Sequence, residues 1–174
     1  MGTAKTKYLI IRDDYNKTIY LLNLIHNNIM TSNIIYKGEL RTEATHIQSN
    51  TVIYTDAPKD NHGKGEAFSP TDLVATALGS CMISIMGIVA LKEGITPVDG
   101  TIAEITKIMY AEPRRIGEVH VKLIFPNRAY TDKEKKIYEH AAYTCPVAKS
   151  LHFRYKTSDR IYLVKINHKK TPNS

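Results

Sequence analysis

The sequence is poor in cysteine and contains none of the standard nucleotide-binding or hydrolase motifs. Only Cys81 and Cys145 occur among 174 residues, too few for the disulfide framework of a small secreted domain. No P-loop, G-x-G-x-x-G run or serine nucleophile elbow is present, so nothing supports nucleotide-binding or α/β-hydrolase chemistry. Residues 1–29 contain no long apolar run with a small-residue cleavage site. These absences predict a cytoplasmic protein in which any disulfide is transient and catalytic.

The net charge of +7 is not concentrated in one basic patch. The densest group of lysines, Lys133, Lys135 and Lys136, is interleaved with Asp132 and Glu134, as on a solvated helix face. We therefore do not expect nucleic-acid binding. Apolar residues make up 43% and charged residues 24% of the chain, which is ordinary for a globular protein of one domain.

A run of nineteen residues, 73–91, has no charged side chain. Its length makes it a candidate membrane span. Eight of the nineteen residues are Ala, Gly, Ser or Thr, which contribute little to membrane insertion. The small residues Ala75, Gly79 and Gly87 fit a helix that protein encloses closely on all sides. We therefore predict a central buried helix and no membrane segment.

The order of the expected elements is typical of an α+β domain with an antiparallel sheet. Ser69, Pro70 and Asp72 predict the start of the long helix, through an N-cap and a capping box, and Gly94 predicts its end. Residues 1–29 show no clean period, so we expect an N-terminal extension, which the fold does not require, ahead of a domain at 30–174. The strands are expected at 34–40, 41–47, 51–54, 101–112, 118–125 and 160–166, and two further helices at 131–143 and 145–151.

The two thiols lie in different local settings. Cys145 directly precedes a proline at a helix start, where free N–H groups and the helix dipole favour a thiolate. Cys81 lies in the middle of the long helix, so as a nucleophile it needs a cation from elsewhere. Each cysteine could equally be a small buried hydrophobe. His140, Cys145 and His152 match no standard zinc spacing, so no metal site is predicted.

Two motifs together resemble those of the OsmC/Ohr family, named for osmotic induction and organic hydroperoxide resistance. They are F-S-P-T-D-L-V-A-T-A-L-G-S-C-M (residues 68–82) and C-P-V-A-K-S-L (residues 145–151). The resemblance covers residues 31–166 and implies an intertwined homodimer whose sheets wrap two central helices. It also implies a thiol-dependent peroxidase without a cofactor. In that activity Cys81 attacks an organic, lipid-type hydroperoxide, Cys145 closes a disulfide, and an external dithiol reductant restores both thiols.

The sequence departs from the family pattern beside the predicted nucleophile. Peroxidatic members place a glutamate directly after the proline of the long helix, paired with an arginine that stabilises the thiolate. Here Thr71 takes that place, and Asp72 follows it. We expect Arg41 to lie near Cys81, held by Glu66 or Asp72. An alternative stays open, in which the protein keeps the fold to bind a small apolar or thiol ligand without peroxidase activity. Other arginines that could serve Cys81 are Arg114, Arg115 and Arg154.

Overall fold

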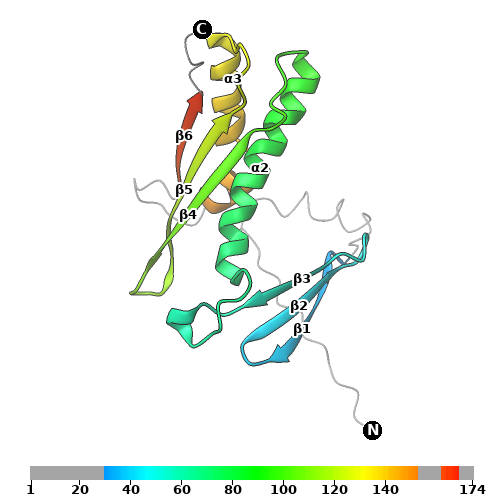
Figure 1. Ribbon diagram of the computed structural model, residues 1–174, viewed down its shortest axis with the longest axis vertical. Coiled ribbons are helices and arrows are strands. Elements are labelled where there is room, and N and C mark those ends of the chain that lie inside the picture. Colours follow the sequence, from blue (N-terminus) through cyan, green and yellow to red (C-terminus); the bar gives the residue numbers. More distant parts are fainter. Residues whose placement is uncertain (1–29, 153–161, 169–174) are drawn as a thin grey trace, which may run out of the picture.

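The fold is given by a computed structural model that describes residues 30–152 and 162–168 (Figure 1). The expected order of strands and helices is confirmed, with boundaries displaced by no more than a few residues. The proposed extension, residues 1–29, lies outside the described residues. In chain order the elements are β1 (Ser32–Gly38), β2 (Arg41–His46), β3 (Val52–Asp56), the short 3-10 helix η1 (Lys59–Asn61), α2 (Pro70–Glu93), β4 (Ile102–Tyr110), β5 (Arg115–Phe125), α3 (Asp132–Tyr143), α4 (Pro146–His152) and β6 (Tyr162–His168).

The strands form two separate three-stranded sheets. The first has the order β1-β2-β3 and is an antiparallel meander. In the second, of order β4-β5-β6, β4 pairs antiparallel with β5, whereas β6 runs parallel to β5. A parallel pair needs a long crossover connection, and the chain between β5 and β6 supplies one that includes α3 and α4. The α+β class is confirmed, and this parallel pair is the feature that the sequence did not indicate.

The ends of α2 form as its sequence predicts. The Ser69 hydroxyl accepts a hydrogen bond from the Asp72 backbone N–H at 3.1 Å, and Asp72 Oδ2 accepts one from the Ser69 N–H at 2.8 Å. Pro70 occupies the first turn, where its missing N–H costs nothing. Gly94 ends the helix at φ +61°, a left-handed conformation that glycine adopts readily.

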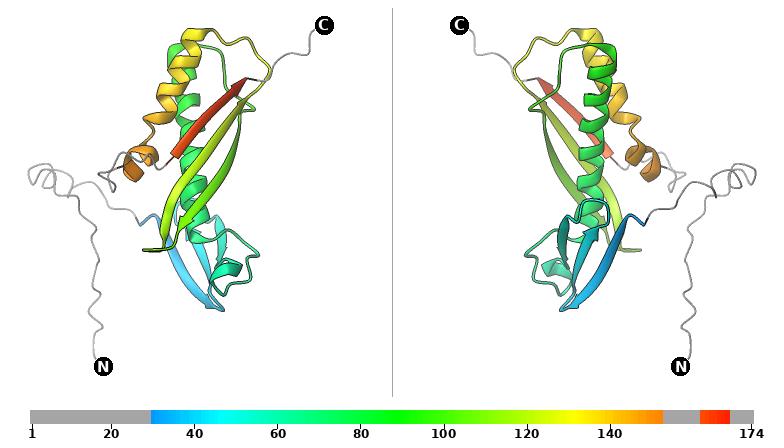
Figure 2. Two further views of the ribbon diagram at one scale, coloured as in Figure 1. Left: turned by 90° about the vertical axis from the view of Figure 1, so that its left-hand side faces the viewer. Right: turned by 90° about the vertical axis from the view of Figure 1, so that its right-hand side faces the viewer.

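One face of α2 packs against the second sheet and α3, as Figure 2 shows from two sides. Leu78, Met82 and Met86 on this face are fully buried. A Cβ built on Gly79 would lie 2.5 Å from Ile105 Cδ1, so β4 approaches the helix closely at this glycine. Burial of this face places the core of the described chain between helix and sheet. The other fully buried side chains of this core include Val119, Leu123, Tyr138, Ala142, Cys145 and Ala148.

The remaining sides of α2 are open within one chain. Val74, Ile88 and Leu91 are exposed, and a Cβ built on Gly87 would meet nothing within 4 Å. By length and composition α2 could cross a membrane, but its packed face marks it as a core helix. The prediction of enclosure on all sides is therefore met on one side only, because the three-stranded second sheet covers a single face.

The first sheet has exposed apolar side chains on both faces. Ile34 and Tyr36 point to one face, at 62% and 64% relative exposure, while Ile35 and Tyr54 point to the other and are also exposed. Alternate residues of a strand face opposite sides, so neither face lies against a closed core in the described chain. This sheet lies beside the N-terminal end of α2, away from the second sheet, α3 and α4 (Figure 1).

Candidate functional site

Cys81 on α2 and Cys145 in the connection between α3 and α4 lie close enough for their side chains to interact. Cys81 is half-buried on α2, Cys145 is fully buried just before α4, and both are free thiols. Burial raises the pKa of the Cys145 thiol, and the neighbouring Cys81 side chain raises it further. The Ala148 N–H donates to Cys145 Sγ at 3.4 Å and acts in the opposite direction. Burial of Cys145 thus opposes the thiolate that its helix start favours, because loss of solvation outweighs the N–H groups.

An apolar hollow of about 500 Å³ lies near the thiols, between α2 and α3. Ile85 and Val89 line it from α2, four and eight residues after Cys81 and so on the same side of the helix. Thr144, which directly precedes Cys145, lines it from α3. The hollow therefore begins about one turn of α2 beyond Cys81, and neither cysteine is among its lining residues. The rest of its lining consists of Glu93, Lys133, Lys136, Ile137, His140 and Ala141.

A guanidinium between two carboxylates lies at the edge of the first sheet. Arg41 Nη2 lies 3.2 Å from Asp56 Oδ2, and Arg41 also forms an ion pair with Glu66. The hydrogen bonds that Arg41 donates to Asp56 and then to Glu66 raise the pKa of Arg41. The pKa of Asp56 is lowered most by the hydrogen bond from the Glu66 N–H and less by Arg41. Together these outweigh burial, which raises it. The expected pairing of Glu66 with Arg41 is present, but Asp56, the second partner of Arg41, was not predicted.

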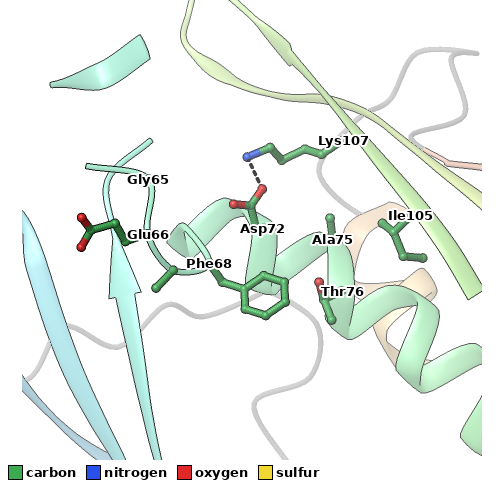
Figure 3. Close-up of a pocket in the computed structure, with 9 residues that line it drawn as sticks. Gly65, Glu66, Phe68, Asp72, Ala75, Thr76, Ile105 and Lys107 are labelled. Atoms are coloured by element: carbon green, nitrogen blue, oxygen red, sulfur yellow. Dashed lines mark ion pairs between the residues drawn. The ribbon is translucent and has the colours of Figure 1, made fainter. Parts of the chain in front are cut away.

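Asp72, the other expected holder of Arg41, pairs with a lysine instead. Lys107 Nζ on β4 lies 2.7 Å from Asp72 Oδ1 (Figure 3). The same Nζ donates a hydrogen bond to Thr71 Oγ1 at 2.7 Å. Although burial favours the protonated carboxyl, hydrogen bonds from Lys107 and Ser69 lower the pKa of Asp72 overall. The sequence contained one sign of this role for Lys107. It follows Ile105 by two residues on the same strand, so its side chain lies on the apolar face of that strand.

A second hollow, of about 480 Å³, opens at the N-terminal end of α2. Figure 3 shows Glu66, Asp72 and Lys107 around it, with Phe68 and Ile105 supplying apolar surface. Charged groups of both signs line this hollow, among them the Asp72–Lys107 ion pair.

The thiols and the Arg41 cluster are separated along α2. Cys81 comes ten positions after Thr71, which corresponds to roughly 15 Å of helix. Within the described chain no hydrogen bond or ion pair joins Arg41 to Cys81, and both partners of Arg41 are carboxylates near the start of α2. The predicted approach of Arg41 to Cys81 thus stays a prediction.

The other arginines have different surroundings. Arg114 pairs with Asp60 at 3.2 Å, and Arg115 lies over the ring of Tyr110. Arg154 lies outside the described residues. Within residues 30–152 no group of three or more His, Cys, Asp or Glu side chains is placed to hold a metal ion.

Comparison with known proteins agrees with this architecture. The family model described as OsmC-like protein matches residues 63–158, a segment that includes both cysteines, Glu66 and the whole of α2. The chain belongs to this family. No curated protein matches it.

Solved structures of OsmC-like proteins share the fold. A candidate osmotic stress induced and detoxification response protein of Psychrobacter arcticus is 48% identical, with a TM-score of 0.70, and the match covers 83% of this chain and 99% of that one. An organic hydroperoxide resistance protein OsmC of Legionella pneumophila is 18% identical over 82% and 98% of the chains, with a TM-score of 0.57. A Vibrio cholerae candidate organic hydroperoxide resistance protein, with captopril bound in one of its active sites, is 15% identical over 82% and 95%, with a TM-score of 0.57.

Proposed function

We propose that this OsmC-like protein is a thiol-dependent peroxidase that reduces organic hydroperoxides. The observation that carries the proposal is the adjacent pair of free thiols, one half-exposed and one buried, with a largely apolar hollow about one helical turn beyond Cys81. The half-exposed Cys81 suits attack on a substrate. The buried Cys145, with its raised pKa, stays a thiol until a sulfenic acid forms next to it.

The reaction balances with one external dithiol. The Cys81 thiolate attacks the terminal peroxide oxygen, the O–O bond breaks, and the alcohol leaves with one proton. The Cys81 sulfenic acid then condenses with the Cys145 thiol, which forms a disulfide and releases water. A dithiol reductant, which we expect in the cytoplasm, returns both thiols by exchange. No cofactor is required.

The apolar hollow supports an organic rather than an inorganic peroxide. Ile85, Val89 and Ile137 would bury the hydrocarbon part of a lipid-type hydroperoxide while its peroxide group lay near Cys81. Hydrogen peroxide would gain nothing from this surface. The name of the Legionella relative, organic hydroperoxide resistance protein, is consistent with this preference.

We also propose a homodimer in which Arg41 of one chain serves Cys81 of the other. Two observations support it: the separation of these residues within one chain, and the uncovered apolar surfaces of α2 and the first sheet. Exposed apolar area of this kind is typical of an interface. A nearby guanidinium would lower the pKa of a half-buried thiol and activate it.

The test is consumption of cumene hydroperoxide with a dithiol, comparing the native protein with Cys81→Ser. We expect turnover by the native protein and none by the variant. Replacing Arg41 by Ala should lower the rate roughly tenfold to a thousandfold, equivalent to about 1.4–4 kcal/mol, with the fold unchanged. A native protein that consumes no hydroperoxide would contradict the proposal and favour a ligand-binding role for the hollow.

A further inference from the structure

We infer that Asp56 is a positioning residue that holds the Arg41 guanidinium in place for the proposed reaction. The inference rests on the proposed function, because it takes Arg41 as the cation that serves a Cys81 thiolate. Asp56 ends β3 and is the direct cross-strand partner of Arg41 at the start of β2. Its carboxylate is fully buried, and its Oδ2 lies 3.2 Å from Arg41 Nη2.

The same oxygen of Asp56 also fixes the loop that carries Glu66. The Glu66 backbone N–H donates to Asp56 Oδ2 at 2.9 Å. The loop is further closed by two backbone hydrogen bonds, from Ala57 N–H to Leu40 at 3.2 Å and from Gly65 N–H to Ala57 at 3.2 Å. One buried carboxylate therefore joins β2, β3 and the loop, and brings Glu66 beside Arg41.

The two carboxylates differ in how firmly they can hold Arg41. The side chain of Glu66 is 63% exposed, so its ion pair is screened by water and constrains the guanidinium weakly. Asp56 has no access to water, so loss of its partner would leave a buried charge uncompensated. Asp56 is consequently the carboxylate that determines where the guanidinium lies.

Two buried atoms of this cluster have no hydrogen-bond partner among the described residues, Asp56 Oδ1 and Arg41 Nε. Buried polar groups of folded proteins are nearly always paired, and an exception calls for an explanation such as a functional role. A cluster that served stability alone would gain from an apolar replacement. The unpaired atoms therefore favour a role in positioning.

The test is a double-mutant cycle between Asp56→Asn and Arg41→Ala, read as kcat/KM for cumene hydroperoxide. Asparagine keeps the shape of the side chain and removes its charge. Misplacing a group by about 1 Å can cost on the order of a hundredfold in rate, so we expect Asp56→Asn to lower kcat/KM roughly 10- to 100-fold. In the Arg41→Ala background the same substitution should change it by less than about twofold. Glu39→Gln, an exposed carboxylate paired with Lys64, is the matched control and should leave the rate unchanged.

If Asp56→Asn lowers kcat/KM equally in both backgrounds, the role of Asp56 is merely structural and the inference is overturned. A native rate for Asp56→Asn would also overturn it. Asp56→Glu, which retains the charge but moves it by one methylene, replaces the asparagine variant in the same cycle if that variant does not fold. If the native protein consumes no hydroperoxide, the proposed function fails, and the pH dependence of Cys81 alkylation tests the inference instead. A midpoint raised equally by Asp56→Asn and Arg41→Ala supports it, and a midpoint unchanged from native overturns it.

Discussion

The body of the molecule (α2, the second sheet, α3 and α4) and its first sheet differ in how far they bury their apolar side chains. The body packs one face of α2 against β4, β5 and α3 and buries Leu78, Met82 and Tyr138 completely. The first sheet has regular pairing between all three strands, yet exposes Ile34 and Tyr36 on one face and apolar residues on the other. Strand pairing is therefore accompanied by little burial of apolar side chains in this sheet, although Thr55 and Asp56 at the end of β3 are buried.

The functional groups are divided between the same two regions. The body carries both thiols and the apolar hollow, whereas the first sheet and its loop carry Arg41, Asp56 and Glu66. Each region holds one half of what the proposed reaction needs. In the proposed dimer, a second copy of the chain covers the open surfaces and brings the two halves together.

The largest effect is expected from placing a charged side chain on the exposed face of the first sheet. Ile34→Asp puts a carboxylate on a face that we expect a second chain to cover, where an unpaired charge is costly. We predict conversion of a dimer to a monomer at micromolar concentration, measured by light scattering, with loss of hydroperoxide turnover. Lys149→Asp on the exposed side of α4 is the control and should stay dimeric. A native protein that is monomeric would refute the dimer outright.

Two glycines of α2 sharpen the contrast between its packed and open sides. Alanine at either position gains about 1 kcal/mol of helix propensity, but at Gly79 the added Cβ meets Ile105, while at Gly87 it meets nothing within 4 Å. Overpacking costs about 1–3 kcal/mol. We predict that chemical denaturation in the Ile34→Asp background, which we expect to be monomeric, finds Gly87→Ala more stable than Gly79→Ala by that amount. Equal stabilities would mean that β4 does not approach the helix closely.

The smallest expected effect concerns acid stability of the body. Hydrogen bonds from the Thr96 N–H, then from Thr131, lower the pKa of Glu134 to about 2. A carboxyl with a depressed folded pKa contributes stability above its unfolded pKa, about 4.3, and loses it as pH falls toward 2. Glu134→Gln should therefore melt at a lower temperature than native at pH 7, with the difference shrinking between pH 4.3 and 2. A difference independent of pH would contradict this assignment.

Local signals in the sequence were sufficient for the elements and for part of the site. The capping boxes at Ser69 and Thr131 satisfy N–H groups of the next turn, so they fix helix starts without tertiary contacts. The pairing of Arg41 with Glu66 was also predicted. The parallel β6 was not, because pairing direction depends on the path of the chain through α3 and α4.

Other features depend on tertiary contacts that no local pattern encodes. Cys145 looked like an activated thiol because only its helix start is visible in the sequence, whereas its burial comes from the surrounding elements. Asp56 reads as an ordinary residue at the end of a strand until β2 places Arg41 opposite it. Lys107 reaches Asp72 and Thr71 only because β4 lies along α2.

The most direct test of a site shared between two chains is complementation between two inactive variants. Cys81→Ser and Arg41→Ala proteins are each purified, mixed, unfolded and refolded together, and assayed with cumene hydroperoxide. If Arg41 of one chain serves Cys81 of the other, half of the mixed dimer's sites are native, and turnover should rise well above that of either variant refolded alone. Turnover no higher than the average of the two variants would show that Arg41 does not act across the interface, and would contradict the account.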